Sequence, residues 1–329
     1  MRLLIFLTSN LLIFIFFLSF SPLKANEDFI DWLSTYKKYA EEKGVSKETI
    51  DIAFKNVAFL DQVIKYDRKQ PEFFEDTITY VSKRANLSRV NIAKRLLKKN
   101  KNLFNDIENK FSVEKEILLS LWGIETNFGK HVGKMDIISC LATLSFDKRR
   151  RDFFSSQLLI LLQLIDKKLI EPDVLYGSWA GAYGNFQFMP STIKNYAIDY
   201  DGNNKIELKK SLEDSAASAA NYISKIGWKK GEPCFYRVKL EKNINKKYIN
   251  TSARKINNRL KISKWKKKGI TSFDGSNINS DLKAALILPD GSENSPAYLV
   301  FQNYEKILKW NRSLRFAISV CTLSNKIKS

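Results

Sequence analysis

Apolar residues recur at helical spacing through much of the chain. This spacing predicts helices over 27–43, 47–56, 72–85, 87–100, 102–110, 114–124 and 152–170. After residue 232 the apolar runs become shorter, and they predict strands at Cys234–Leu240, Lys283–Leu288 and Ala297–Gln302, with helix again over 303–325. The pattern therefore predicts a mainly α protein with a small β-containing part near the C-terminal third.

Local signals mark several element boundaries. Ser46 is a predicted N-cap for the helix over 47–56. Ser112 is a predicted cap for the helix over 114–124, although Lys115 stands where a capping box has an acid. Pro289-Asp290-Gly291 predicts a turn between the last two strands.

The N-terminal segment 1–25 has the pattern of a secretory signal peptide. Met1-Arg2 precedes an apolar run over 3–20, and a small residue, Ala25, follows Lys24 at the predicted cleavage point. A retained membrane anchor is the alternative, because the run is close to membrane-spanning length. We expect an exported protein, membrane-associated if the segment is retained.

Charge is strongly positive. The 329 residues include 55 lysines and arginines against 35 acidic residues, a formal charge of +20 at pH 7. Between Lys242 and Lys268 there are eleven basic residues and no acid, with Tyr248 and Trp265 among them. This stretch fits RNA binding in a cytosolic protein, a solvated insertion, or a basic surface that attracts an anionic envelope polymer. The export signal argues against a nucleic-acid partner.

Histidine and cysteine are scarce, which narrows the available chemistry. A single histidine, His131, excludes most Ser-His-Asp and multi-histidine metal sites. Three scattered cysteines form neither a disulfide scaffold nor a zinc cluster, and, being odd in number, they cannot all pair internally. Cys140 is expected to be a small core residue in a buried helix. Catalysis, if present, is therefore expected to depend on carboxylates.

Glu125 is the strongest candidate catalytic group. It follows the largely apolar stretch Glu116–Trp122 and lies between glycines that end a helix. Burial and the carbonyl end of the helix would both raise its pKa, and a carboxylic acid that stays protonated near neutrality suits a general acid. The alternative is a helix-end glutamate that caps the helix or pairs with Lys130.

A second segment, Gly177–Ser191, mixes glycine, aromatic and amide residues. Glycine allows close backbone approach, and Ser178, Asn185 and Gln187 offer neutral hydrogen-bonding groups. This composition suits recognition of a sugar, whose ring has apolar faces and hydroxyl edges. A glycine-rich helix junction is the alternative explanation.

Together the two segments carry a resemblance to a known family. W-G-I-E-T-N-F-G and G-S-W-A-G-A-Y-G-N-F-Q-F-M-P-S resemble the membrane-bound lytic murein transglycosylase B family, and Leu141–Arg151 and Ala220–Trp228 match it as well. The resemblance implies a lysozyme-like α+β fold. The mature chain would then comprise a helical catalytic region over 26–231, a basic β-containing subdomain over 232–300 and a segment over 301–329 that returns to the catalytic domain.

The resemblance also implies an activity. The family cleaves the MurNAc–GlcNAc β-1,4 bond of peptidoglycan in the periplasm without water, leaving a 1,6-anhydroMurNAc end. Glu125 matches its sole catalytic residue, an acid that then acts as a base, so no cofactor is required. Peptidoglycan strands are the implied partner, nucleic acid is not, and the sequence names no envelope protein. An exported peptidoglycan-binding module and a lysozyme-type hydrolase are the alternatives.

Further site residues follow from the resemblance alone. The positions that match the family's substrate groove are Ser178, Gln187, Met189, Arg150, Arg151, Tyr80, Tyr222, Asn311 and Trp310. Two tyrosines of the family are replaced here, one by Trp310 and one by Phe316. Trp310 can still stack on a sugar, whereas Phe316 has no hydroxyl group to donate.

A candidate calcium loop follows the second segment. Asp199, Asp201 and Asn203 place oxygen ligands at alternate positions, as at the start of an EF-hand loop, and the family carries a calcium site here. Asn204 replaces the turn glycine and Lys210 the closing acid. We therefore expect weak calcium binding, or a metal-free Asx-type loop.

Overall fold

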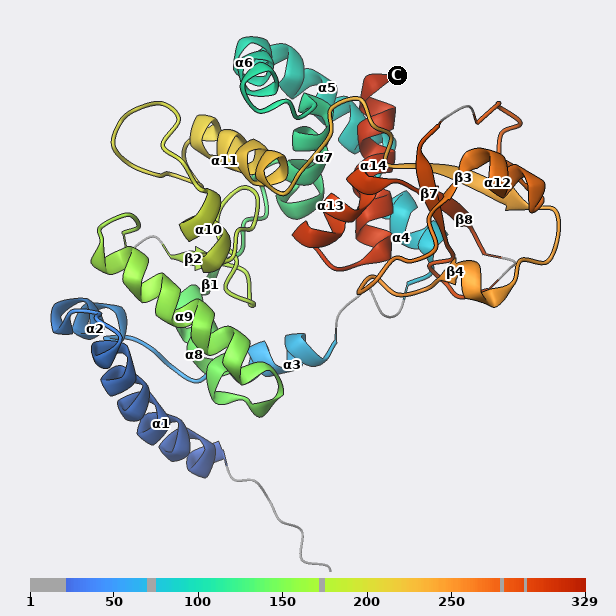
Figure 1. Ribbon diagram of the computed structural model, residues 1–329. Coiled ribbons are helices and arrows are strands. Elements are labelled where there is room, and N and C mark those ends of the chain that lie inside the picture. Colours follow the sequence, from blue (N-terminus) through green and yellow to red (C-terminus); the bar gives the residue numbers. More distant parts are fainter. Residues whose placement is uncertain (1–21, 70–74, 172–174, 279–280, 293–294) are drawn as a thin grey trace, which may run out of the picture.

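The computed structural model describes residues 22–69, 75–171, 175–278, 281–292 and 295–329 (Figure 1). The apolar run of the predicted signal peptide lies outside the described residues. The first helix, α1 (Pro22–Glu42), already includes Ala25, so the predicted cleavage point falls within a helix. In the described part of the chain, no helix is both long and apolar enough to cross a membrane.

Helices dominate the described chain. After α1 come α2 (Lys47–Ala53), α3 (Asp61–Arg68), α4 (Thr77–Arg84), α5 (Leu87–Lys99), α6 (Lys101–Phe111), α7 (Lys115–Thr126), α8 (Ile137–Phe146), α9 (Arg151–Asp166), α10 (Pro190–Tyr196), α11 (Leu212–Lys225), α12 (Ile262–Lys267), α13 (Gln302–Trp310) and α14 (Leu314–Lys328), with 3-10 turns η2 (Lys148–Arg150) and η4 (Lys246–Tyr248). The predicted helices are present, although α4 is shorter than the predicted 72–85, whose first residues are outside the described ranges. The mainly α prediction is confirmed.

The two cap predictions have different outcomes. Ser46 is the N-cap of α2, and its hydroxyl oxygen accepts a hydrogen bond from the backbone N–H of Thr49 at 3.2 Å, as predicted. The prediction for Ser112 is wrong. Ser112 ends α6 in a left-handed conformation (φ 54°), and α7 begins after Glu114, which makes no side-chain cap. The Glu114 carboxylate instead accepts the indole N–H of Trp228 at 2.6 Å, a contact that only the tertiary fold supplies.

The C-terminal tail also differs from its prediction. The expected helix over 303–325 is divided into α13 and α14. Asn311 adopts an extended conformation (φ −137°), and Ser313 starts α14 by accepting the backbone N–H of Phe316 at 3.2 Å. A side chain that bonds the backbone competes with a continuous helix, which explains the break.

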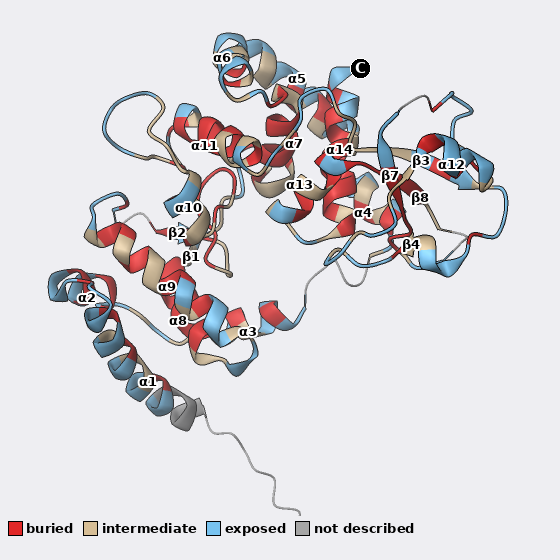
Figure 2. Ribbon diagram, in the orientation of Figure 1, coloured by how far each residue is buried: buried red, intermediate tan, exposed pale blue. Residues whose placement is uncertain are grey.

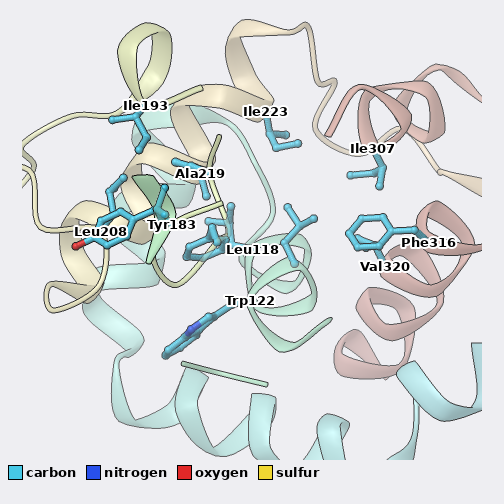
Figure 3. Close-up of a cluster of buried hydrophobic side chains, with 14 of the residues drawn as sticks. Leu118, Trp122, Tyr183, Ile193, Leu208, Ala219, Ile223, Ile307, Phe316 and Val320 are labelled. Carbon is cyan, nitrogen blue, oxygen red and sulfur yellow. The ribbon is translucent and has the colours of Figure 1, made fainter. Parts of the chain in front are cut away.

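Helix α7 is the centre of the main core. Residues 117–123 are all buried, and α14, α5, α6 and α11 pack around the helix. Figure 2 shows α7 and α14 as largely buried, in contrast to the exposed outer face of α1. In Figure 3, Phe316 lies with Ile307 and Val320 in this core. The helix that carries Glu125 is therefore enclosed by protein for most of its length.

The short strands of the described ranges form two sheets. β1 (Met135–Asp136) pairs antiparallel with β2 (Tyr176–Gly177). The larger sheet has the order β4-β7-β8-β3-β6, with β5 also paired to β7, and among the described strands β4 and β7 pair parallel while the other pairs are antiparallel. Its strands are β3 (Phe235–Leu240), β4 (Ile249–Asn250), β5 (Leu260–Lys261), β6 (Ile270–Ser272), β7 (Lys283–Ile287) and β8 (Ala297–Val300).

The larger sheet separates two cores. Along β7, Leu286 packs into a small core with Trp265 of α12, while its neighbour Ile287 packs into the main core. β8 alternates in the same way, with Leu299 in the small core and Val300 in the main one. Because successive strand residues point to opposite faces, one apolar strand joins the subdomain to the helical body.

A disulfide between Cys234 and Cys321 joins the start of β3 to α14. Cys140 is free and buried in α8, as expected. The two paired cysteines are 87 positions apart, so their pairing required the folded arrangement.

Candidate active site

Glu125 lies in the last turn of α7 and is partly exposed. The helix ends directly behind it, because Asn127, Phe128 and Gly129 all adopt positive φ (50°, 60° and 83°). Such a conformation is unusual for a bulky residue such as Phe128 and costs energy that the surrounding structure must supply. The abrupt helix end places Glu125 at the edge of the core.

Contacts from two other parts of the chain hold this helix end. The Thr126 hydroxyl donates to the backbone oxygen of Asn185 at 2.8 Å and accepts the backbone N–H of Gly129 at 3.0 Å. On the other side, the Nε of Arg89 in α5 donates to the carbonyl of Gly123 at 3.1 Å. Arg89 therefore puts positive charge at the carbonyl end of α7, where the sequence alone suggested only negative potential.

Gly123 lets the turn fold back onto the helix. A Cβ atom at Gly123 would lie 2.7 Å from Cζ of Phe128, closer than real Cβ atoms come to other atoms. The Phe128 ring packs edge-to-face on Trp122, with ring centroids 5.7 Å apart. Glycine is thus required one turn before the left-handed residues, for packing.

An aromatic wall stands beside Glu125. The indole Nε1 of Trp310, the last residue of α13, donates to Oε1 of Glu125 at 2.9 Å. Trp310 stacks on Tyr222 with a centroid distance of 5.1 Å, and Tyr222 stacks on Tyr196 at 4.5 Å. Burial raises the pKa of Tyr222 to about 12, and its hydroxyl donates to the carbonyl of Lys309 at 3.1 Å. The structure therefore brings together Glu125, Trp310 and Tyr222.

Two phenylalanines of the glycine-rich segment pack against this aromatic wall. Phe186 and Phe188 meet the Trp310 ring edge-on, at 6.3 Å and 5.3 Å between centroids. Gln187, between them, has a positive φ of 51°, and its Nε2 donates to the carbonyls of Val132 and Gly184. Ser178 and Ala182 close a small loop, in which the Ser178 hydroxyl accepts the N–H of Ala182 at 2.9 Å.

Several polar and glycine residues of the segment serve internal packing. Asn185 is buried and accepts the indole N–H of Trp122 at 3.2 Å. A Cβ at Gly177 or Gly184 would come within 2.5 Å of a backbone oxygen of the protein. The glycines therefore allow protein segments to approach one another closely.

Of the two predicted arginines, Arg150 belongs to an ion-pair cluster around Asp67. Asp67 of α3 is buried and receives ion pairs from Arg68, Arg149 and Arg150. Arg151 points elsewhere and donates to the carbonyl of Phe146 at 3.0 Å. Sequence analysis singled out Arg150 and Arg151 and missed Arg149, which shares Asp67 with Arg150.

The remaining predicted groove residues differ in exposure. Tyr80 is only 2% exposed, and the Arg84 guanidinium covers its ring at 3.4 Å. Met189 and Asn311 are partly exposed, and Asn311 follows Trp310 at the end of α13. Phe316 is 3% exposed and is a core residue (Figure 3).

The candidate calcium loop contains an acid that sequence analysis missed. Carboxylate oxygens of Asp199, Asp201 and Asp214 lie within 4.8 Å of one another. Asp214 is buried in the first turn of α11, where it also accepts the backbone N–H of Tyr200 at 2.8 Å. Loss of surrounding water, with the charges of Asp214 and Asp199, raises the pKa of Asp201. A set of hard oxygen atoms fits calcium.

Asn203, the third predicted ligand, makes a hydrogen bond within the loop. Its side-chain oxygen accepts the backbone N–H of Lys205 at 2.8 Å, as in an Asx turn. The EF-hand spacing did not point to Asp214, because Asp214 lies beyond Lys210, the position where an EF-hand loop closes.

The fold and the site together define a class of protein: a mainly helical, lysozyme-like structure that presents one glutamate at the end of a buried helix, beside an aromatic wall. The chain belongs to the family described as the transglycosylase SLT domain, whose model matches residues 28–325.

Individual relatives agree with this family. Membrane-bound lytic murein transglycosylase B of Escherichia coli (strain K12) is 30% identical over 223 residues, which are 66% of this chain and 58% of that protein. The alignment thus spans less than two thirds of the relative. The resemblance stated from the motifs is confirmed.

Solved structures of relatives share the fold. SltB3 of Pseudomonas aeruginosa, in complex with NAG-NAM-pentapeptide, is 31% identical with a TM-score of 0.83, covering 92% of this chain and 80% of that one. Escherichia coli Slt35, in complex with calcium, is 25% identical with a TM-score of 0.76, covering 94% and 95%. SltB3 is also known in complex with NAG-anhNAM-pentapeptide.

Proposed function

We propose that this protein is a peptidoglycan lytic transglycosylase with Glu125 as its catalytic residue. The observation that supports this most directly is the position of Glu125, at the end of a buried helix and in hydrogen-bond contact with Trp310. The SltB3 complexes hold a NAG-NAM and a NAG-anhNAM pentapeptide. An anhydro sugar is the product expected when no water takes part.

The proposed reaction uses one carboxyl group twice. Glu125 first donates its proton to the glycosidic oxygen as the bond from C1 of MurNAc to that oxygen breaks. As a carboxylate it then accepts the proton of the C6 hydroxyl of MurNAc, whose oxygen bonds to C1. The products are a free GlcNAc 4-hydroxyl and a 1,6-anhydroMurNAc end. No second carboxylate is needed, unlike in most glycosidases.

Substrate contacts are proposed around this centre. Trp310 and Tyr222 provide an aromatic surface for the sugar rings. Polar contacts come from Ser178, Gln187 and Asn311, and Met189 adds a flexible apolar one. Arg150 and Arg151 would meet carboxylates of the stem peptides. Tyr80 would contribute only if Arg84 moved, because that side chain covers the ring.

Two further features belong to the proposal. One is the domain organisation, with a catalytic body formed by 26–231 and 301–329 and a basic subdomain formed by 232–300. The two cores on either side of the sheet support this division. Calcium binds weakly between Asp199, Asp201 and Asp214, and catalysis does not require it. The Slt35 complex with calcium and the three clustered carboxylates support a metal here.

We also propose that the protein is exported to the periplasm. The signal-like segment 1–25 and the disulfide between Cys234 and Cys321 support export, because disulfides persist in oxidising compartments. Cell fractionation and N-terminal sequencing of the purified protein decide where it lies and whether the segment is removed.

Digestion of purified murein tests the reaction. We expect the wild-type protein to release muropeptides lighter by one water than lysozyme products, and Glu125→Gln to release none while still binding murein. Glu116→Gln, the same change in the first turn of α7, is the control and should retain activity. Mass spectrometry identifies the products.

Each alternative function gives a different result in this assay. Reducing-end products would make the protein a lysozyme-type hydrolase. Binding without release, by the wild-type protein and the variant alike, would make it a peptidoglycan-binding module and overturn the proposal.

A further inference from the structure

The bond between Trp310 and Glu125 connects residues that are 185 positions apart. The indole N–H donates to one defined oxygen, Oε1, at 2.9 Å. Because Glu125 must both give and take a proton in the proposed reaction, a fixed donor on one of its two oxygens has chemical consequences.

The direction of the indole N–H is fixed by its surroundings. The Trp310 ring stacks on Tyr222 with an interplanar angle of 28°, and Phe186 and Phe188 pack against it in T-shaped contacts at 68° and 60°. Tyr222 is itself held by the stack on Tyr196 and by its hydrogen bond to the Lys309 carbonyl. A ring enclosed in this way cannot turn without displacing several neighbours.

An indole nitrogen donates a hydrogen bond and accepts none. A neutral carboxylic acid has one carbonyl oxygen, which is the better acceptor, and one hydroxyl oxygen, which carries the proton. The oxygen that faces the N–H is therefore favoured as the carbonyl, and the other oxygen as the hydroxyl.

We propose that Trp310 is a positioning residue that assigns the acidic proton of Glu125 to Oε2. This inference rests on the proposed function. In the first step the Oε2 proton passes to the glycosidic oxygen as the C1–oxygen bond breaks, and the N–H stabilises the negative charge left on the carboxylate. In the second step Oε2 takes the proton of the C6 hydroxyl as its oxygen bonds to C1, which restores the neutral acid.

Removal of the N–H alone tests the proposal. Trp310→Phe keeps an aromatic ring and removes the donor, and replacement of Trp310 by β-(3-benzothienyl)alanine keeps the shape of the bicyclic ring as well. With soluble, uncrosslinked murein glycan strands, we expect kcat to fall by about 10- to 100-fold, the range for a lost hydrogen bond to a charged group, with KM changed by less than about twofold.

Trp228 supplies a matched control. Its indole N–H also donates to a glutamate carboxylate, that of Glu114, but at the other end of α7, about 16 Å along the helix axis from Glu125. Trp228→Phe should lower stability and leave kcat of the folded protein within about twofold. The hydrogen bond that it removes lies far from Glu125, so its loss affects folding near Glu114 and not the reaction.

Two results would overturn the inference. One is an unchanged kcat in the benzothienyl variant. The other is a raised KM with unchanged kcat, which would make Trp310 a platform for the sugar only. Both differ from failure of the proposed function, in which the wild-type protein itself yields no anhydro product.

Discussion

Thr126 shows how one buried hydroxyl group connects the end of α7 to the glycine-rich segment. It is fully buried, and it bonds the backbone of Asn185 and of Gly129 on opposite sides. The bond to Asn185 links the end of α7 to the segment that supports the aromatic wall, and the bond to Gly129 holds the turn that ends α7. The position of Glu125 relative to Trp310 therefore depends on a neighbouring residue whose hydroxyl group bonds backbone atoms.

Replacement of Thr126 by valine tests this dependence. Thr126→Val keeps the side-chain shape but removes the partner of the buried Asn185 carbonyl and of the partly buried Gly129 N–H, so we expect a loss of about 1–3 kcal/mol in the free energy of unfolding. We also expect slower muropeptide release below the unfolding transition. Urea denaturation and the murein assay measure the two effects.

Thr143→Val in α8 is the matched control for this variant. Thr143 is equally buried, and its hydroxyl oxygen accepts the backbone N–H of Leu60 at 3.1 Å. This change should lower stability by a similar amount and leave turnover of the folded protein intact. Equal loss of turnover in both variants would contradict a specific connection through Thr126.

At the scale of elements, the acids of the candidate calcium loop between α10 and α11 also hold the backbone of that loop. Asp199 accepts the backbone N–H groups of Gly202 and Asn204 at 2.8 Å each, so the loop already has internal hydrogen bonds. Asp214 joins it to α11. A loop that is already satisfied by its own backbone gains little from a cation.

Calcium should therefore stabilise the protein only slightly. We expect a dissociation constant in the millimolar range. Free calcium at ten times this constant then adds about 1.4 kcal/mol to the free energy of unfolding. Asp214→Asn should abolish this increment, and EDTA should leave murein cleavage unchanged. Calorimetry and thermal denaturation measure the effect, and tight binding by calorimetry would refute weak affinity.

For the whole molecule, the basic subdomain forms a surface with little internal neutralisation. Of the eleven basic residues between Lys242 and Lys268, only Arg259 pairs with a carboxylate, that of Glu305, in the described part of the chain. Lys264 and Lys267 are exposed on α12. The surface suits attraction to the carboxylates of murein stem peptides.

Binding to murein sacculi should accordingly weaken as salt is raised, because ions screen exposed charges over about 10 Å at 0.1 M. Lys264→Glu with Lys267→Glu should weaken cosedimentation with sacculi at low salt. Lys98→Glu with Lys99→Glu, the same charge change on exposed positions of α5, is the control. Equal effects of the two pairs would assign the attraction to net charge, and binding that is insensitive to salt would exclude it.

The sequence by itself determined the local features of this protein. Helical spacing predicted α1, α2, α5, α6, α7 and α9, short apolar runs predicted β3, β7 and β8, and Ser46 marked its helix start. These features depend on residues a few positions apart, which a linear pattern contains. The motif around Glu125 identified the family for the same reason, since its residues are contiguous.

Only the tertiary structure decided which distant residues meet. The donor to Glu125 comes from Trp310, the partner of Cys234 is Cys321, and Asp214 completes the acidic cluster. Ser112 did not become an N-cap, because it ends α6 in the left-handed conformation and Glu114 precedes α7 instead. Each outcome depends on how helices and sheet pack together, and packing selects contacts by shape and burial across the whole chain, which no local spacing encodes.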